Sequence, residues 1–228
     1  MSQEEPVKDP YFDQIVKAYE LDMDKLHREF IEPPRYLSLM HCANEIYNKG
    51  IKGDVAECGV FRGYFAQYIN SFFSDRELHL YDTFIGFPSG DVKYDKQFGY
   101  LSGKHDIGVD SGMFHEQTEM NEVLKRMEFP EMVHFHVGRV PETLDFSDNR
   151  KYCFVSIDCD LSLPTFGAME YFYPRMSVGG YIFVHDYNHG AGDFFGVKEA
   201  LQRYQKIYEI ELKYVPISDF SGTAVIVK

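Results

Sequence analysis

From residue 53 onward, short apolar runs alternate with helical patterns, and this alternation constrains the fold more than any other feature of the sequence. Five segments have the length and pattern of strands: 54–59, 77–83, 132–137, 152–157 and 180–184; the second alternates polar and apolar residues, and the fourth is continuously apolar. Around them, apolar residues recur at helical spacing over 63–73, 116–127, 164–173 and 196–208. Buried strands joined by helices indicate a parallel sheet that helices cover on both faces.

The last two strand-like segments, 211–216 and 223–228, are separated by a short turn and predict a hairpin. The sequence therefore predicts a single Rossmann-like α/β domain: a mostly parallel seven-stranded sheet with helices on both faces and an antiparallel C-terminal edge hairpin. In such folds, ligands bind beyond the carboxyl ends of the strands, near the point where the strand order reverses.

Residues 1–50 are predicted to form an N-terminal helical extension that caps the domain formed by residues 51–228. Apolar spacing predicts one helix over 11–30, ended by Pro33-Pro34, and a second helix over 36–47. Residues 84–116 are rich in Gly, Asp, Ser and Lys and show no clear period. This segment is too long for an ordinary connection, so we expect it to be a lid or substrate loop.

Composition excludes several classes of function. The formal net charge is −13 and no cluster of Lys and Arg is present, which argues against a nucleic-acid partner. No apolar run approaches 18 residues and the N-terminus is polar, so we expect neither a membrane-spanning helix nor a signal peptide. The four cysteines form no C-x-x-C pair and are expected to be reduced thiols in a cytoplasmic protein.

The turn after the first strand carries the first candidate site, of the form E-x-G-x-x-x-G. Gly59 would let the backbone approach a ligand, and Gly63 would let the next helix start close to the sheet. The motif lacks the G-x-G-x-x-G pattern of dinucleotide sites, and the Glu57 carboxylate suits a cationic sulfonium amino acid better than a pyrophosphate. The alternative is an ordinary strand-to-helix turn.

Asp82 ends the second predicted strand, 19 residues after Gly63. Rossmann-type sites place an acidic residue at about this distance, where it accepts hydrogen bonds from ribose hydroxyls. The alternative is an exposed aspartate in a turn. The glycine turn upstream favours the ribose-binding interpretation.

Polar side chains also follow two later strands. Asp158 and Asp160 come directly after the run 152–157, and His185 and Asp186 follow the run 180–184. If these strands are neighbours, the four side chains converge, and carboxylates with an imidazole can hold a divalent cation. The alternative is that they cap helices and form turns.

Five segments in order resemble the macrocin O-methyltransferase family, which methylates sugars of antibiotics and glycans. They are VAECGVFRGYFA, LYDTFIGFP, SIDCDLSLPT, FYPRMSVGGYIFVHDY and GVKEAL, and they span roughly residues 53–228. The resemblance implies a class I methyltransferase fold, S-adenosylmethionine as cofactor, usually Mg²⁺, and often a homo-oligomer. Its implied acceptor is a small-molecule sugar or glycoside, with neither nucleic acid nor membrane as a partner.

The resemblance also implies roles for individual residues. The positions of Glu57, Gly59 and Asp82 contact the cofactor in the family; Asp158, His185 and Asp186 occupy metal positions, and Asp160 the general-base position. With the reasoning from the residues themselves, the predicted cofactor-binding set is Glu57, Gly59, Gly63, Asp82 and Asp158. Many members carry two acidic residues where this chain has His185-Asp186, and Ser162-Leu163 replaces a common Tyr-acidic pair.

Three alternatives remain open from the sequence. A catechol or phenol O-methyltransferase uses similar metal chemistry, and fold alone does not distinguish the acceptors. A nicotinamide-dependent oxidoreductase can share the fold, although the missing G-x-G-x-x-G motif and Glu57 argue against it. A non-catalytic binding protein is the third alternative, and the presence of all three aspartates after the two strands argues against it.

Overall fold

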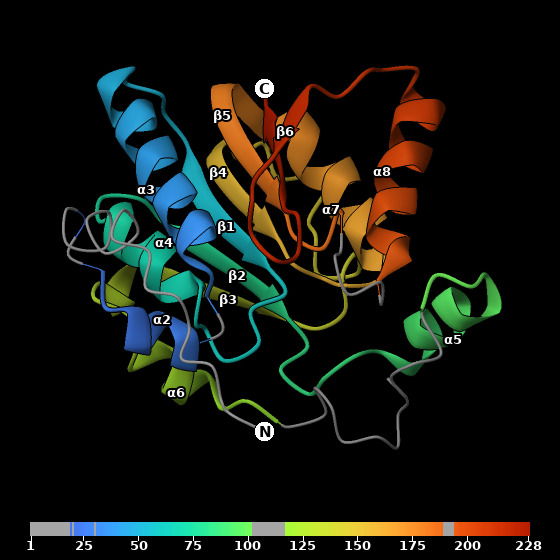
Figure 1. The fold of residues 1–228 in the computed structure, drawn as a ribbon, viewed down its shortest axis with the longest axis horizontal. Helices are drawn as coiled ribbons and strands as arrows, with labels where there is room; N and C mark the ends of the chain where they lie inside the picture. Colours follow the sequence, from blue (N-terminus) through green and yellow to red (C-terminus); the bar gives the residue numbers. More distant parts are fainter. Residues whose placement is uncertain (1–18, 20, 30, 102–116, 189–193) are drawn as a thin grey trace, which may run out of the picture.

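The computed structural model describes residues 19, 21–29, 31–101, 117–188 and 194–228. Within them, one seven-stranded sheet has the order β3-β2-β1-β4-β5-β7-β6 (Figure 1). The strands are β1 (Asp54–Cys58), β2 (Leu78–Asp82), β3 (Val133–Val137), β4 (Tyr152–Ile157), β5 (Met176–Val184), β6 (Tyr214–Pro216) and β7 (Ala224–Val227). The predicted fold class is confirmed.

The first five strands are parallel, and β7 runs antiparallel to both β5 and β6. The predicted C-terminal hairpin is therefore present. In it, β7 lies between β5 and β6, and β6 forms the edge of the sheet. The strand order reverses between β1 and β4, because the chain leaves β1 toward β2 and β3 and later returns to β4 on the other side. The carboxyl ends of β1 and β4 are thus where a ligand is expected.

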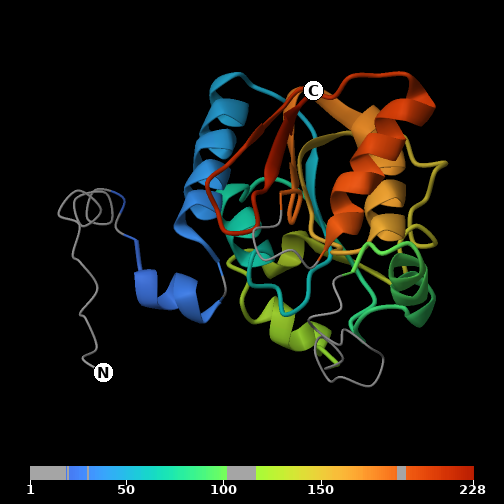
Figure 2. The same ribbon diagram turned by 45° about the vertical axis from the view of Figure 1, so that its right-hand side comes forward.

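Helices cover both faces of the sheet, as Figures 1 and 2 show. On one face, α3 (Pro33–Asn48), α4 (Ala66–Phe72) and α6 (Met120–Leu124) share an apolar core with the sheet. On the other face, α7 (Ser162–Phe172) and α8 (Phe195–Tyr208) share a second core. All six residues of β4 are buried, because this central strand is covered from both sides.

The N-terminal part differs in detail from the prediction. The described residues before Pro33 contain only the short helix α2 (Met23–Arg28), and residues 11–18, 20 and 30 of the predicted first helix lie outside the described ranges. Pro33 and Pro34 open α3, since proline is tolerated in the first helical turn, where its missing N–H is not needed. The division of the chain at residue 50 stays a prediction, and α3 packs into the same core as α4.

The segment 84–116, for which the sequence predicts no regular element, contains the helix α5 (Ser89–Gln97). Two buried acidic side chains anchor this helix. Asp91 binds the guanidinium of Arg139 through both carboxylate oxygens. Asp95 accepts hydrogen bonds from the backbone N–H and the hydroxyl of Ser162, at the start of α7. Residues 102–116 lie outside the described ranges, so the predicted lid is untested there.

Two short 3₁₀ turns, Pro130–Met132 before β3 and Tyr173–Arg175 before β5, lead into their strands. All four cysteines are free thiols, as predicted from their spacing. Among the described helices, none is both long and apolar enough to cross a membrane.

Candidate active site

Four side chains meet at the carboxyl ends of β4 and β5, and we call them the acidic cluster: Asp158, Asp160, His185 and Asp186. Each offers one ligand atom, and these atoms all lie within 4.8 Å of one another. The predicted convergence is confirmed. Its cause is the pairing of β4 with β5, which brings the residues after the two strands to the same edge of the sheet.

The backbone holds the cluster in place. The amide of Asp158 donates to the carbonyl of Cys58 at 2.7 Å, and the amide of His185 donates to that of Ile157 at 2.9 Å, so strand-like bonding continues one residue past β4 and β5. Asp160 and Asp186 then adopt left-handed conformations, with φ of 59° and 56°. Aspartate tolerates this region better than most residues, and non-glycine residues in it recur at active sites.

Charges inside the cluster are strongly coupled. His185 Nδ1 lies 2.9 Å from Asp158 Oδ1 and 2.9 Å from Asp186 Oδ2. Burial and the charge of Arg35 act to lower the pKa of His185, but the two carboxylates outweigh them and raise it to about 10. Burial, with the charges of Asp186 and Asp158, raises the pKa of Asp160 well above its ordinary value. The cluster therefore contains a carboxyl group that binds a proton more readily than a free aspartate.

Arg35, which the sequence analysis did not identify, reaches this site from the first turn of α3. Its Nη2 donates to Asp158 Oδ2 at 2.9 Å and to the hydroxyl of Ser156 at 3.2 Å. The guanidinium lies 3.9 Å from the centre of the Phe65 ring. The charges of His185 and Arg35 outweigh burial and lower the pKa of Asp158.

A sequence pattern could have revealed this arginine. Arg35 is in helical register with Leu39, Ala43 and Ile46, the buried face of α3. A charged residue on an otherwise apolar helix face needs a buried partner, because an unpaired buried charge is costly.

Glu57 lies at the carboxyl end of β1 and is only 1% exposed. Burial raises the pKa of Glu57 well above its ordinary value, while the charge of Arg35 opposes this shift. Its Oε2 is buried and has no hydrogen-bond partner. A ligand that donates a hydrogen bond to this oxygen would satisfy it.

The two motif glycines are explained by contacts within the chain. Gly59 has φ of +86°, and a side-chain Cβ there would lie 1.9 Å from the carbonyl oxygen of Asp158. Gly63 has φ of +76°, and its Cβ would lie 2.7 Å from the Val123 side chain of α6. Both positions therefore require glycine for the packing of the turn itself. Direct contact of either glycine with a ligand is untested.

Asp82 lies outside the acidic cluster and joins the turns that follow β1 and β2. Its Oδ2 accepts from the amides of Val60 at 2.6 Å and Phe61 at 2.9 Å, and its Oδ1 accepts from the amide of Phe84 at 2.7 Å. Because a carboxylate offers about four lone-pair positions, ribose hydroxyls would have to compete with these donors.

A hollow of about 430 Å³ borders the acidic cluster, and we call it the α8 pocket. Its lining residues are Tyr100, Asp186, Tyr187, Asn188, Phe194, Phe195, Lys198, Glu199 and Gln202. Asp186 belongs to both the pocket and the cluster. Aromatic walls with a few polar groups are typical of small-molecule sites of this size.

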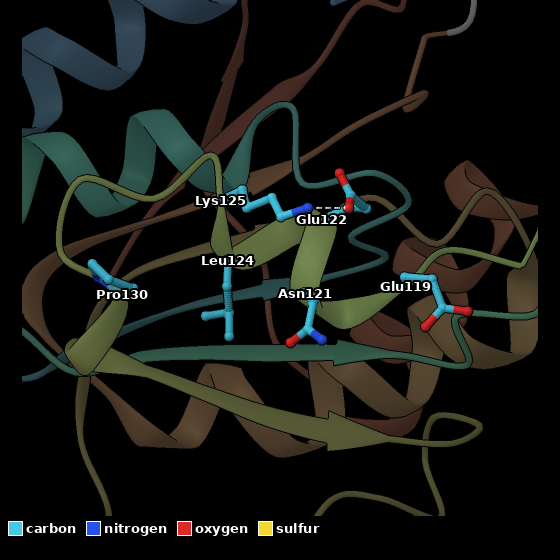
Figure 3. Close-up of a pocket in the computed structure, with 6 residues that line it drawn as sticks. All are labelled: Glu119, Asn121, Glu122, Leu124, Lys125 and Pro130. Carbon is cyan, nitrogen blue, oxygen red and sulfur yellow. Dashed lines mark hydrogen bonds and ion pairs between the residues drawn. The ribbon is translucent and has the colours of Figure 1, made fainter.

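A second hollow of about 540 Å³ lies against α6 (Figure 3). It is lined by Glu119, Asn121, Glu122, Leu124, Lys125 and Pro130, and contains no residue of the acidic cluster. Lys125 is paired with Glu122 on the surface of the same helix. The α8 pocket is therefore the better candidate for a substrate site.

Comparison with known protein families gives one match over nearly the whole chain. The sequence model of the macrocin-O-methyltransferase family matches residues 1–227. The 8-demethyl-8-(2,3-dimethoxy-alpha-L-rhamnosyl)-tetracenomycin-C 4'-O-methyltransferase of Streptomyces olivaceus is 24% identical over 208 residues, covering 82% of this chain and 70% of that protein. The mycinamicin III 3''-O-methyltransferase of Micromonospora griseorubida is 25% identical over 191 residues, covering 80% of this chain and 72% of that protein.

Solved structures share the fold. The O-methyltransferase NovP superposes with a TM-score of 0.66 at 21% identity, covering 87% of this chain and 81% of that one. The calicheamicin methyltransferase CalS11 gives 0.63 at 14% identity, covering 100% of this chain and 98% of that one. An O-methyltransferase from Bacillus cereus in complex with SAH gives 0.56 at 13% identity, covering 96% and 97%. At these identities the likeness shows the class I methyltransferase fold alone.

Proposed function

Because this chain belongs to the macrocin O-methyltransferase family and is an S-adenosylmethionine-dependent O-methyltransferase, we propose that it methylates a hydroxyl of a sugar or of a glycosylated small molecule. One observation carries the proposal: the acidic cluster borders the α8 pocket at the carboxyl ends of the strands, with Asp186 in both. The relatives named above are methyltransferases of sugar-bearing natural products, which supports the same class of acceptor here.

The cofactor is proposed to bind over the turn after β1. Glu57, Gly59, Gly63, Asp82 and Asp158 are the proposed contacts. The buried Glu57 oxygen that lacks a partner supports this placement, because the amino-acid end of S-adenosylmethionine carries an ammonium group that donates hydrogen bonds. A dinucleotide would instead bring phosphate charges close to Glu57.

Methyl transfer consists of an in-line attack by the acceptor oxygen on the sulfonium methyl carbon. The new C–O bond forms as the C–S bond breaks, S-adenosylhomocysteine leaves as a neutral thioether, and the hydroxyl proton passes to Asp160. The raised pKa of Asp160 supports this role, since an ordinary aspartate is a weak base toward an alcohol. Most of the rate enhancement is expected from holding the two reactants in line.

The cluster also fits a divalent cation, and we propose Mg²⁺ held by Asp158, His185 and Asp186. Asp158 and Asp186 supply carboxylate oxygens, which Mg²⁺ prefers, whereas the imidazole of His185 is a softer ligand that must lose its proton to bind. When bound, such a cation lowers the pKa of an alcohol and stabilises the alkoxide. The metal proposal is tested by exhaustive chelation followed by Mg²⁺ addition. Turnover should fall and then recover, and full turnover after chelation would rule out metal dependence.

The α8 pocket is the proposed acceptor site. Its polar residues Asn188, Lys198, Glu199 and Gln202 can exchange hydrogen bonds with the several hydroxyls of a sugar ring. Its aromatic residues provide apolar walls for the ring or for an attached aglycone.

A labelled-methyl experiment tests the proposal. Purified protein would be incubated with S-adenosylmethionine bearing a deuterated methyl group and with matched panels of glycosides and catechols. We expect the label on a sugar oxygen, located by NMR, and no transfer by Asp160→Asn. Label found only on catechols would contradict the sugar proposal and favour phenol methylation.

A further inference from the structure

Arg35 and Glu57 each keep a buried polar atom without a hydrogen-bond partner. The atoms are Arg35 Nε and Glu57 Oε2, two of only six such side-chain atoms among the described residues. Arg35 is 2% exposed and Glu57 1% exposed. Because an unsatisfied buried donor or acceptor is costly, a pair of them at one site indicates a ligand that supplies the missing partners.

The two side chains share one face of the sheet. Glu57 on β1 is paired with Ser156 on β4, and directly paired residues of neighbouring strands project from the same face. Arg35 Nη2 donates to that same Ser156 and to Asp158 at the end of β4. The arginine thus lies across the carboxyl ends of β1 and β4, next to Glu57 and to the turn at Gly59.

The two unpartnered atoms of Arg35 and Glu57 define the kind of ligand that can satisfy them. Arg35 offers a donor for an anionic oxygen, and Glu57 offers an acceptor for a cationic N–H. A purely anionic ligand would leave Glu57 unsatisfied, and a purely cationic ligand would leave Arg35 Nε unsatisfied. A zwitterionic α-amino acid carries both charges on neighbouring atoms and satisfies both groups.

We propose that Arg35 binds the α-carboxylate at the amino-acid end of the methyl donor through Nε, opposite Glu57, which accepts from its α-ammonium. The inference rests on the proposed binding of that cofactor over the β1 turn. It makes α3 part of the cofactor site. It also gives the site a means to reject nucleosides that lack the amino-acid end.

Two ligands that differ only at the amino-acid end test the proposal. Calorimetry would compare S-adenosylhomocysteine with 5'-methylthioadenosine, which lacks the amino and carboxylate groups, in buffer without divalent cations. Arg35→Lys keeps a cation beside Asp158 but removes the guanidinium Nε–H, which is the donor that the proposal uses. We expect its affinity for S-adenosylhomocysteine to fall about tenfold or more, and its affinity for 5'-methylthioadenosine to change by less than about twofold.

A matched control is available at the opposite end of the sheet. Arg76 donates to the backbone carbonyls of Gly53 and Ile51, before β1, and its side chain is also largely buried. Arg76→Lys should leave the preference for S-adenosylhomocysteine over 5'-methylthioadenosine unchanged. If Arg35→Lys does not fold, Glu57→Gln measured against the same two ligands replaces it, with the same selective loss expected.

The outcomes separate this inference from the proposed function. An equal loss for both ligands, or no loss for either, would overturn the role of Arg35 while leaving cofactor binding intact. If the wild-type protein binds neither ligand, the cofactor placement itself fails. Binding of free methionine with an affinity equal to that of S-adenosylhomocysteine would overturn the proposal, because the subsite would then serve an amino acid without the nucleoside.

Discussion

At the scale of single residues, Asp160 combines a left-handed backbone conformation with repulsion from two neighbouring carboxylates. Its φ of 59° is costly for a side chain that has a Cβ, and it lies beside Asp158 and Asp186 within one cluster. Strained residues of this kind cluster at active sites. Substitutions at Asp160 can therefore be measured for two separate effects, on the stability of the fold and on turnover.

Asp160→Asn should abolish methyl transfer with little effect on cofactor affinity. Asparagine also tolerates the left-handed region, so the backbone is kept while the proton acceptor is lost. We expect turnover to fall by a factor of about 10² or more, and affinity for S-adenosylhomocysteine to stay within about twofold. Single-turnover kinetics and calorimetry on one preparation measure the two effects. Persistent turnover would show that Asp160 is not the base.

Glycine substitutions should separate strain from function. Asp160→Gly and Glu209→Gly each remove a Cβ from a left-handed residue, the second at the C-terminal end of α8 with φ of 51°. Each should stabilise the fold by about 1 kcal/mol. Only Asp160→Gly should lose turnover. Denaturant unfolding measures the stability, and destabilisation by both changes would argue against stored strain.

At the scale of secondary-structure elements, α5 depends on tertiary contacts for its position. Its sequence, SGDVKYDKQ, has low helix propensity in its first turn, and the surrounding residues 84–116 show no period. The anchors are Asp91, on Arg139 after β3, and Asp95, on Ser162 of α7. Neither partner lies nearby in the sequence, so the helix was not predicted.

Breaking the Asp91 anchor should destabilise the protein. Asp91 is 1% exposed. Asp91→Asn therefore replaces a buried carboxylate by a neutral amide, which is a weaker partner for Arg139. We expect a loss on the order of 2 kcal/mol, below the range for fully buried pairs because Arg139 is partly exposed. Glu142→Gln is the control, since the exposed Glu142 pairs with the same arginine, and it should cost less than about 0.5 kcal/mol. Equal effects of the two variants would refute the anchor.

The pairing of β2 with β3 should weaken in acid. His79 Nδ1 lies 3.1 Å from His136 Nε2 and 2.8 Å from Arg150 Nη1, with His134, Asp54 and Asp148 nearby. Burial first, then the His79 and Arg150 charges, lowers the pKa of His136 to about 4. The unfolded chain therefore binds more protons below about pH 6.5, so the contribution of His136 is full above that pH and is lost as the pH falls toward 4.

His136→Phe tests this acid response. Phenylalanine can keep the stacking on Tyr81, whose ring lies 4.2 Å from that of His136, but it cannot titrate. The unfolding free energy of the variant should depend less on pH between 6.5 and 4 than that of the wild type. Both proteins are compared with their own values at pH 8, where the histidine is neutral. Parallel curves would show that His136 does not contribute.

At the scale of the whole molecule, the site joins segments that are far apart in the chain. Arg35 comes from α3, Glu57 from β1, Asp158 from the end of β4 and His185 from the end of β5. A cofactor bound there would link these segments. Ligand binding should therefore stabilise the fold as a unit.

S-adenosylhomocysteine should raise the melting temperature, and NAD should not. At a ligand concentration of about 100 times Kd, the stabilisation is about 2.7 kcal/mol, or roughly 5–10 °C for a chain of this length. Differential scanning fluorimetry with each ligand measures the shift. A shift with NAD alone would favour the oxidoreductase alternative.

The sequence by itself determined the seven strands, the helices that alternate with them apart from α5, and the polar residues that follow the strands. These follow from local periodicity, and parallel strands bring their carboxyl ends to one edge whatever the details of packing. Asp158, Asp160, His185 and Asp186 could therefore be predicted to converge if their two strands were neighbours, and the structure shows that β4 and β5 are. Only the tertiary structure decided that Arg35 joins them, that Asp82 binds the turn after β1, and that Gly59 is required by the Asp158 carbonyl. Each of these depends on contacts between residues at least 20 positions apart, which no local pattern encodes.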